Sequence, residues 1–135
     1  MTRGGRSADR AGSNLARRVR SAESRLAQRL SCDQSIAGDG FFSLAMIADF
    51  DRSLAEDGAS FYRNLFWEAG VIGQMLYLEA EAAAARGTGI GCFYDDAVHD
   101  TLGLTGHAFQ SLYHFTVGIP VEDRRLTTEP GYAWE

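Results

Sequence analysis

The sequence predicts a domain that mixes helices and strands in the order helix–strand–helix–strand–helix–strand. Three segments support this prediction: a helical pattern from Ser60 to Arg86, an apolar run over Phe41–Ala48, and an alternating run over Phe109–Val117. Apolar residues at helical spacing predict an amphipathic helix, whereas a short apolar run or strict alternation predicts a strand. At 135 residues, 45% of them hydrophobic, the chain can bury a core of its own.

The N-terminal part divides into a leader and a first helix. Residues 1–13 hold almost no apolar side chain, so we expect a disordered leader, with the folded domain spanning residues 14–135. Ser13 or Asn14 can cap a helix that runs to about Leu30. Residues 31–40 are polar and glycine-rich and are expected to form a loop. The buried strand over Phe41–Ala48 follows and ends at Asp49-Phe50-Asp51.

The long central helix is the strongest prediction. Ser60 is its expected N-cap, Arg86 its cationic last turn and Gly87 its C-terminal glycine. Its apolar face is expected to contain Phe61, Leu65, Ala69, Ile72, Leu76, Ala80 and Ala83. Gly70 and Gly73 inside the helix each cost about 1 kcal/mol relative to alanine. We therefore expect a second helix, a subunit partner or a flat ligand to approach the helix closely there.

The C-terminal part is expected to contain two short elements and a final strand. Thr88–Phe93 is a short strand or a tight turn. Asp95 or Asp96 then starts a short helix that Gly103 closes. After the alternating strand, an irregular tail runs to Glu135.

Composition and charge argue against several classes of function. Eight of the 13 basic residues lie in residues 1–30, and a basic segment of this kind could bind nucleic acid through phosphate contacts. Its arginines have no interleaved aromatic residues, so a solvated helix face is favoured and nucleic acid is not an expected partner. No apolar run approaches the roughly 20 residues that cross a bilayer. No apolar segment follows the first arginines as it would in a signal peptide.

The cysteines and histidines predict neither a disulfide framework nor a metal site. Cys32 and Cys92 are too few and lack CxxC spacing, so we expect a reduced, cytoplasmic setting with Cys92 as a small buried hydrophobe. His99, His107 and His114 fall on a helix, a loop and a strand, without a zinc pattern. His114 is expected to be packed or hydrogen-bonded.

No acid–base pair or nucleophile stands out, and no catalytic residue is assigned. There is no GxSxG motif. Glu79 and Glu81 lie about 200° apart around the helix at 3.6 residues per turn, so they do not form a paired site. The alternating glycines Gly87, Gly89 and Gly91 follow a helix instead of preceding one, so they form neither a Rossmann nor a Walker loop. Such a turn can lie against a flat group, although glycines also simply turn chains.

A series of short motifs runs through the second half of the chain: Tyr62-Arg63, Glu68-Ala69-Gly70, Gly73-Gln74, Leu76-Tyr77-Leu78-Glu79-Ala80, the GTGIGCF segment, Asp95-Asp96-Ala97-Val98, Leu102-Gly103-Leu104, Leu112-Tyr113-His114-Phe115-Thr116-Val117-Gly118 and Arg125. In this order they resemble the C-terminal part of the nitroreductase superfamily, in particular its SagB-type dehydrogenase branch. The similarity extends from about Leu15 to Tyr132 and is most specific from Tyr62 to Arg125.

The resemblance implies an FMN-dependent α+β fold, a mixed sheet flanked by helices with a long central helix, that forms a homodimer with flavins in its interface. It implies that Gly89, Ile90, Gly91 and Cys92 lie beside the isoalloxazine ring, where a backbone N–H faces the reactive flavin nitrogen. It also implies that a basic residue after the last strand binds the FMN phosphate. Arg125 occupies that position, with Arg124 as the alternative, and a guanidinium fork suits phosphate.

The implied activity is hydride transfer between a nicotinamide, NADH or NADPH, or a small organic substrate and the flavin, so that most of the chemistry belongs to the cofactor. The family's N-terminal segment, with an R-S-x-R type FMN-binding motif, is expected many residues before Leu15. We interpret Arg6-Ser7-Ala8-Asp9-Arg10 as a coincidental match, and we expect an N-terminally truncated domain.

The SagB-type azoline oxidases have a Lys-Tyr pair just before the glycine that matches Gly58. This chain has Glu56-Asp57 there, so a generic flavin reductase is the safer prediction. The alternative hypothesis is a non-catalytic relic or interaction module that keeps the core of the fold without flavin.

Overall fold

A small antiparallel sheet forms the centre of the fold. The computed structural model describes residues 22–127, 129, 131 and 132, so the predicted leader and the start of the first helix lie outside the described residues. The strands are β1 (Phe42–Asp49), β2 (Arg86–Ile90) and β3 (Phe109–Gly118), in the spatial order β1-β3-β2. β3 pairs antiparallel with both neighbours. The predicted strands over Phe41–Ala48 and Phe109–Val117 are confirmed to within one residue at each end.

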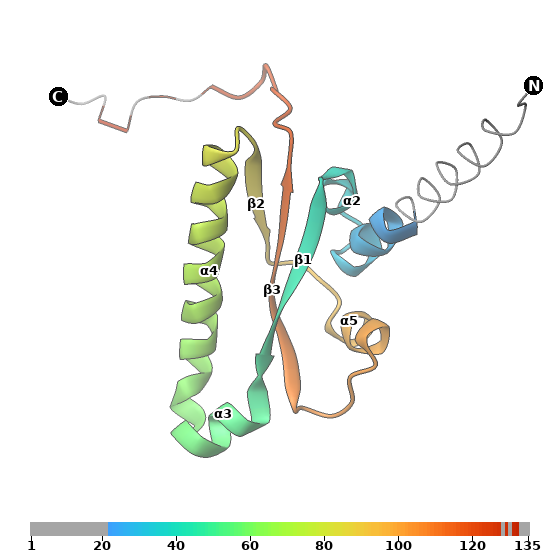
Figure 1. Ribbon diagram of the computed structural model, residues 1–135, viewed down its shortest axis with the longest axis vertical. Helices are drawn as coiled ribbons and strands as arrows, with labels where there is room; N and C mark the ends of the chain where they lie inside the picture. The colour runs from blue at the N-terminus through green and yellow to red at the C-terminus, as the bar shows by residue number, and fades with distance from the viewer. Residues whose placement is uncertain (1–21, 128, 130, 133–135) are drawn as a thin grey trace, which may run out of the picture.

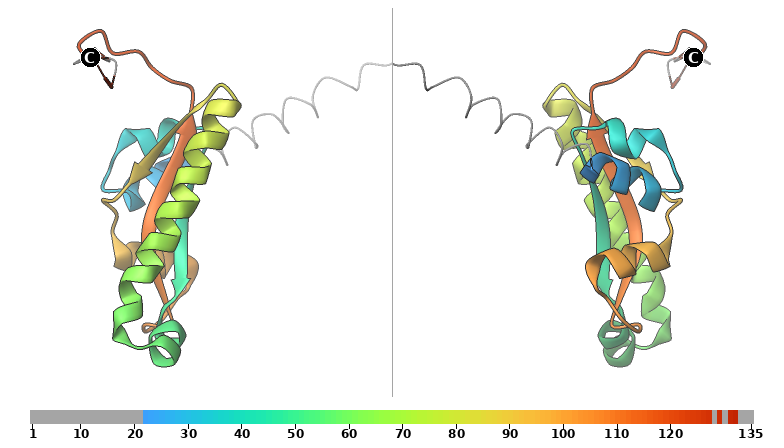
Figure 2. Two further views of the ribbon diagram at one scale, coloured as in Figure 1. Left: turned by 90° about the vertical axis from the view of Figure 1, so that its left-hand side faces the viewer. Right: turned by 90° about the vertical axis from the view of Figure 1, so that its right-hand side faces the viewer.

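Helices cover the two faces of this sheet unequally. The long helix α4 (Tyr62–Ala82) lies along one face, and a helix over residues 22–30, α2 (Ser35–Asp39) and α5 (Asp95–Leu102) lie on the other (Figures 1 and 2). α3 (Phe50–Asp57) and a 3-10 turn, η1 (Ala59–Phe61), join β1 to α4 at one end of the sheet. The α+β class is therefore confirmed, but the sheet of the described residues is purely antiparallel and not the mixed sheet that the resemblance implies.

The core lies between α4 and the sheet. Phe115 is fully buried and packs with Val117 against Ala80 and Ala85, as the alternation in β3 predicts. The register slips between Met46 and Ile47 of β1, which leaves one extra residue on β3, Leu112. Because of this bulge, Leu112 also packs toward α4, against Leu65 and Ala69.

Two helices appear where the sequence predicted none. α2 lies inside the expected loop over residues 31–40, and α3 follows directly where β1 was expected only to end. In α3, Asp49 occupies the N-cap position, its carbonyl accepts a hydrogen bond from Ser53 Oγ, and its carboxylate pairs with Arg52. These contacts are local, but polar side chains make them. Apolar periodicity does not detect such contacts, so the sequence pattern did not predict α3.

The bounds of α4 differ from the prediction at both ends. The helix starts at Tyr62 after η1 and has no side-chain cap, so the assignment of Ser60 as N-cap is wrong. It ends at Ala82, and Ala84 adopts a left-handed conformation with φ 56°. The Ala85 N–H then donates to Ala80 O at 2.8 Å, a bond that closes the last turn. Arg86 and Gly87 are therefore not the helix end, because pairing with β3 recruits them into β2.

Two residues of the predicted apolar face of α4 are also misplaced. Ile72 is 51% exposed, and Gly73 takes the buried position beside it. Ala83 is exposed at the C-cap, one residue past the helix. At the other end of the chain, α5 spans Asp95–Leu102 and ends at Gly103, whose φ is 67°, which confirms the predicted short helix.

The cysteines correct a further expectation. Cys32 and Cys92 form a disulfide across 60 residues of sequence, with a Cα–Cα distance of 5.8 Å. The expectation of two reduced thiols is therefore wrong, and Cys92 is exposed instead of buried. The pairing follows from tertiary structure, since the turn after helix 22–30 lies against the segment after β2. In the described part of the chain, no helix is long and apolar enough to cross a membrane.

Candidate functional site

The glycine-rich segment Gly87–Gly91 is largely an edge strand. A Cβ added to Gly87 would lie 2.6 Å from the ring of Phe115, and one added to Gly89 would overlap the hydroxyl of Tyr113. Real Cβ atoms essentially never approach another atom within 3.0 Å. Packing of the chain's own aromatic rings therefore explains both of these glycines.

Two other glycines have no such explanation within the chain. A Cβ on Gly91 or on Gly70 would meet nothing within 4 Å, and neither residue has a positive φ. Gly70 is exposed in the middle of α4, where a glycine costs about 1 kcal/mol relative to alanine. By contrast, Gly73 faces Tyr113, whose Cε1 would lie 3.1 Å from an added Cβ. A close approach is thus found at Gly73, but it is made by Tyr113 of β3 and not by the second helix, subunit partner or flat ligand that we expected.

A groove is lined in part by Gly70 and Gly73, whereas Gly91 is not among its lining residues. It lies between one side of α4 and Tyr113 of β3 and has a volume of about 280 Å³. Its lining is mainly aromatic rings and glycine backbone, with one free amide: Phe66, Ala69, Gly70, Gly73, Gln74, Tyr77 and Tyr113. Ligand sites are typically concave and largely apolar with a few polar groups, and this groove has that character.

Two tyrosine hydroxyls join the groove to β2. The backbone N–H of Gly89 donates to Tyr77 Oη at 2.8 Å, and the Tyr77 ring packs edge-on against Phe115. Burial, and then the neighbouring Tyr77 hydroxyl, raise the pKa of Tyr113. Neither tyrosine was selected as a site residue from the sequence. The sequence offers a signal only for Tyr113, whose phenol alternates with the apolar residues Phe115 and Val117.

The four residues predicted to contact the flavin point in different directions. Gly89 faces α4, whereas Ile90 is 3% exposed and pairs with His114 in the sheet. Gly91 is exposed just past the end of β2, and Cys92 is bonded to Cys32 on the face of the sheet opposite α4. Within this stretch, exposed backbone without a side chain is thus found at Gly91.

The two candidate phosphate ligands lie elsewhere in the described chain. Gly118 pairs with Arg86, so the tail that holds Arg124 and Arg125 leaves from the end of β2 opposite to Gly91. The side chain of Arg125 is exposed and hydrogen-bonds Asp123, which lowers the pKa of that carboxyl. The structure therefore does not bring the arginines and the glycine segment together within one chain.

His114 is a packed, hydrogen-bonded residue, as predicted. Its ring nitrogens lie 3.3 Å from Ser31 Oγ and 3.1 Å from Ser111 Oγ, and its ring stacks on Phe93 at 4.3 Å. Burial lowers the pKa of His114, and the charge of Asp95 partly opposes this effect. Among the described residues, no group of three or more potential ligands could hold a metal ion.

The outer side of α4 is a second exposed feature. Four large apolar side chains recur along it at helical spacing and are each more than half exposed: Trp67, Val71, Met75 and Leu78. Contiguous apolar patches of this kind mark interaction surfaces.

Comparison with known proteins agrees with this architecture. Residues 6–119 match the model of the nitroreductase family. A candidate nitroreductase from Anabaena variabilis is 31% identical, with a TM-score of 0.67 over 73% of this chain and 20% of that chain. Nitroreductase A from Vibrio parahaemolyticus shares the fold at 16% identity, with a TM-score of 0.63 over 81% of this chain and 50% of that chain.

The chain thus spans only 20% and 50% of the length of these two structures. No curated protein shows a significant match. The family match covers most of the sequence. The chain belongs to the nitroreductase family, a family of flavin-dependent oxidoreductases.

Proposed function

We propose that this chain is part of an FMN-dependent oxidoreductase that transfers hydride between a nicotinamide, NADH or NADPH, or an organic substrate and the flavin. Family membership supports the flavin. The observation that supports the location is the pair Gly70 and Gly91, since neither glycine is required by the fold around it. A flat ring system is the kind of ligand that uses exposed backbone without a Cβ.

The residues present fit one edge of such a ring system. The groove offers aromatic walls at Phe66 and Tyr77 and an amide at Gln74 that can donate or accept a hydrogen bond. Gly91 would present exposed backbone to the ring, and the buried side chain of Ile90 anchors that backbone to the sheet. Bound FMN would supply the redox chemistry itself, so the protein's part is to bind, orient and shield it.

Arg125, with Arg124 as the alternative, is proposed to bind the FMN phosphate. In this chain Arg125 is held by Asp123 through its Nε and Nη2 atoms. Phosphate binding would therefore require Arg125 to exchange the carboxylate for a phosphate, which offers the same bidentate geometry. Replacing Asp123 with asparagine should then favour phosphate binding.

A homodimer is proposed through the apolar side of α4. Trp67 and Val71 are 63% and 65% exposed, and two such helices packed together would bury both rows. Gly70 lies next to these residues in α4. A partner helix, and not a ligand, could therefore pack against the exposed backbone at Gly70. Dimer formation and flavin binding therefore require separate measurements.

Within the family, the SagB-type dehydrogenase branch is proposed on the resemblance of the motifs from Tyr62 to Arg125. Glu56 and Asp57, in the last turn of α3, occupy the place of the Lys-Tyr pair of azoline oxidases. A generic flavin reductase in the cytoplasm remains the proposed role.

A non-catalytic relic or interaction module is the second candidate. It is favoured by two groups that already have partners inside the chain: the Gly89 N–H, bonded to Tyr77, and Arg125, bonded to Asp123. If these partners persist, a flavin would find fewer free donors in the glycine segment than the resemblance implies.

Reconstitution with FMN separates the two candidates. The purified protein is incubated with FMN, freed of excess ligand, and examined for flavin absorption and for oxidation of NADH or NADPH with a quinone or nitroarene acceptor. The proposal expects retained flavin and acceptor-dependent turnover. A folded dimer that retains no FMN at high micromolar concentration would support the relic.

A further inference from the structure

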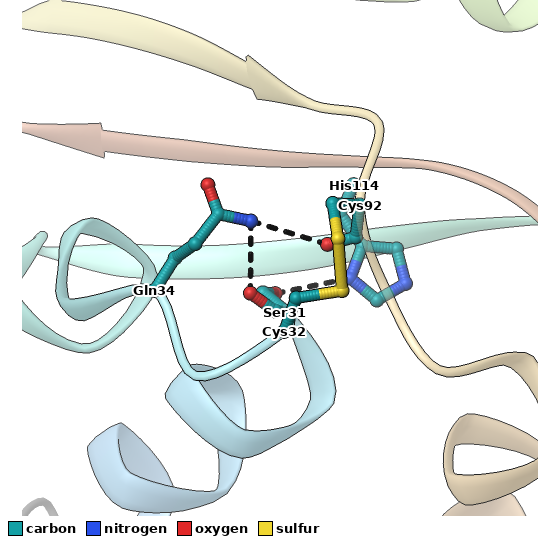
Figure 3. The surroundings of a disulfide bond; sticks show 5 residues. All are labelled: Ser31, Cys32, Gln34, Cys92 and His114. Carbon is teal, nitrogen blue, oxygen red and sulfur yellow. Dashed lines mark hydrogen bonds between the residues drawn. A yellow bond between two sulfur atoms is a disulfide. The ribbon is translucent and has the colours of Figure 1, made fainter.

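The disulfide joins two segments that are also held together by a few hydrogen bonds and by contacts with His114. Cys32 lies in the turn after helix 22–30, and Cys92 lies two residues past the end of β2. Figure 3 shows the Gln34 amide between them, donating to Ser31 O at 2.9 Å and to Cys92 O at 3.2 Å. A backbone bond from Tyr94 N to Leu30 O at 2.9 Å also connects them, and His114 contacts both Ser31 and Phe93.

The turn at Cys32 has an unfavourable backbone conformation. Cys32 and Asp33 have φ values of 54° and 57°, so two consecutive residues with side chains are left-handed. Left-handed conformations are disfavoured for such residues and persist only where surrounding contacts impose them. The covalent bond to Cys92 is the strongest of those contacts, so its loss would allow the turn to relax.

The bond is open to attack from one side. Cys92 is exposed, whereas Cys32 is partly buried beneath the turn. An external thiolate can therefore attack Cys92 Sγ to form a mixed disulfide, and the electron pair of the broken S–S bond leaves on Cys32 Sγ. A second thiolate of the same dithiol then attacks the mixed disulfide and releases Cys92 as a thiolate. The dithiol is oxidised by two electrons and the protein is reduced by two, and each protein thiolate takes a proton from water.

We propose that the Cys32–Cys92 disulfide is a thiol-sensitive clamp that fixes the backbone after β2, including Gly91, and releases it when a dithiol reduces the bond. The consequence for flavin affinity rests on the proposed function, because Gly91 is part of the proposed flavin contact. The clamp itself does not depend on the cofactor. Disulfides in reducing compartments are usually transient and often act as redox sensors. Exposed disulfides are more easily reduced than buried ones.

Hydrogen–deuterium exchange of the FMN-free protein tests the clamp. Amide exchange is compared before and after dithiothreitol treatment, with free thiols titrated in both samples. The clamp predicts about tenfold faster exchange at Gln34 and Tyr94, whose amides bond Ser31 and Leu30, and unchanged exchange in β3 at Phe115. The double variant C32S/C92S is the matched control: it should resemble the reduced protein and not respond to dithiothreitol.

Equal exchange in the two redox states would overturn the clamp, as would loss of protection throughout β3, since that result means global unfolding. FMN titration of the oxidised protein and of C32S/C92S provides the second measurement. About tenfold weaker FMN binding by the variant supports control of the flavin contact, and equal binding refutes it while leaving the proposed function intact. Absence of FMN binding in both proteins refutes the proposed function, and the clamp is then decided by exchange alone.

Discussion

Replacing Gly89 with alanine tests whether this glycine serves the chain's own packing. The added Cβ would overlap the Tyr113 hydroxyl and lie 2.5 Å from Cζ of the same ring, so the ring or β2 must shift. Overpacking of this kind costs about 1–3 kcal/mol, whereas alanine gains about 0.5–1 kcal/mol over glycine in a regular element. The net expectation is a loss of about 1–2 kcal/mol in the free energy of unfolding.

Urea unfolding followed by tryptophan fluorescence measures this loss. Gly91→Ala is the matched control, because its Cβ would meet nothing within 4 Å, and its stability should lie within about 0.5 kcal/mol of the parent. Tyr113→Phe in the Gly89→Ala background should restore part of the loss, because the overlapping hydroxyl is gone while Cζ remains close. If Gly89→Ala and Gly91→Ala prove equally stable, the packing explanation of Gly89 is refuted.

Three further predictions concern stability. Ala84→Gly should stabilise the protein by about 1 kcal/mol in urea unfolding because φ is 56° there. Ala82→Gly in the helix should destabilise it by a similar amount. If both variants changed the free energy of unfolding in the same direction, the left-handed turn would be contradicted. Because burial lowers the pKa of His114 below its ordinary 6.5, its contribution to stability is present above pH 6.5 and is lost as the pH falls toward its folded value. Urea titrations of the parent and His114→Gln should diverge in that range, and parallel curves would exclude the effect. Reducing the Cys32–Cys92 bond should lower the free energy of unfolding by roughly 4 kcal/mol, the loop-closure entropy that the bond removes from the unfolded chain, and a loss below about 1 kcal/mol would contradict this expectation.

Local patterns were sufficient to predict the elements whose burial is periodic. Phe115 and Val117 alternate in β3, and Leu65 and Ala69 mark the buried side of α4, so both elements were found from the sequence. α3 was missed because none of its residues is buried and polar contacts at Asp49 start it.

The remaining differences depend on contacts between distant residues. Arg86 and Gly87 look like a helix end, but Ala84 makes the turn and the ladder with β3 takes the next residues. The disulfide joins cysteines 60 residues apart, a pairing that spacing alone does not reveal.

The glycine segment illustrates the same limit at the candidate site. Gly87, Gly89 and Gly91 occupy alternate positions in the sequence. Their spacing alone does not show which of them packs inside the chain and which could contact a ligand. Only the positions of Phe115 and Tyr113 show that two of them are explained by internal packing and that Gly91 is not. The part of the segment that the proposal assigns to flavin is therefore narrower than the sequence suggested.

The most direct test of the central claim is FMN titration of the parent, Gly91→Leu and Ala82→Leu, monitored by flavin fluorescence, with unfolding and oligomeric state measured alongside. Both positions are exposed, but Ala82 lies at the C-terminal end of α4, close to the start of β2, whereas Gly91 follows the end of β2. We expect Gly91→Leu to weaken FMN binding at least about tenfold, a change of about 1.4 kcal/mol. Ala82→Leu should bind FMN as the parent does, and the free energy of unfolding of both variants should equal that of the parent. Equal FMN affinity in all three proteins would contradict the placement of the flavin at Gly91.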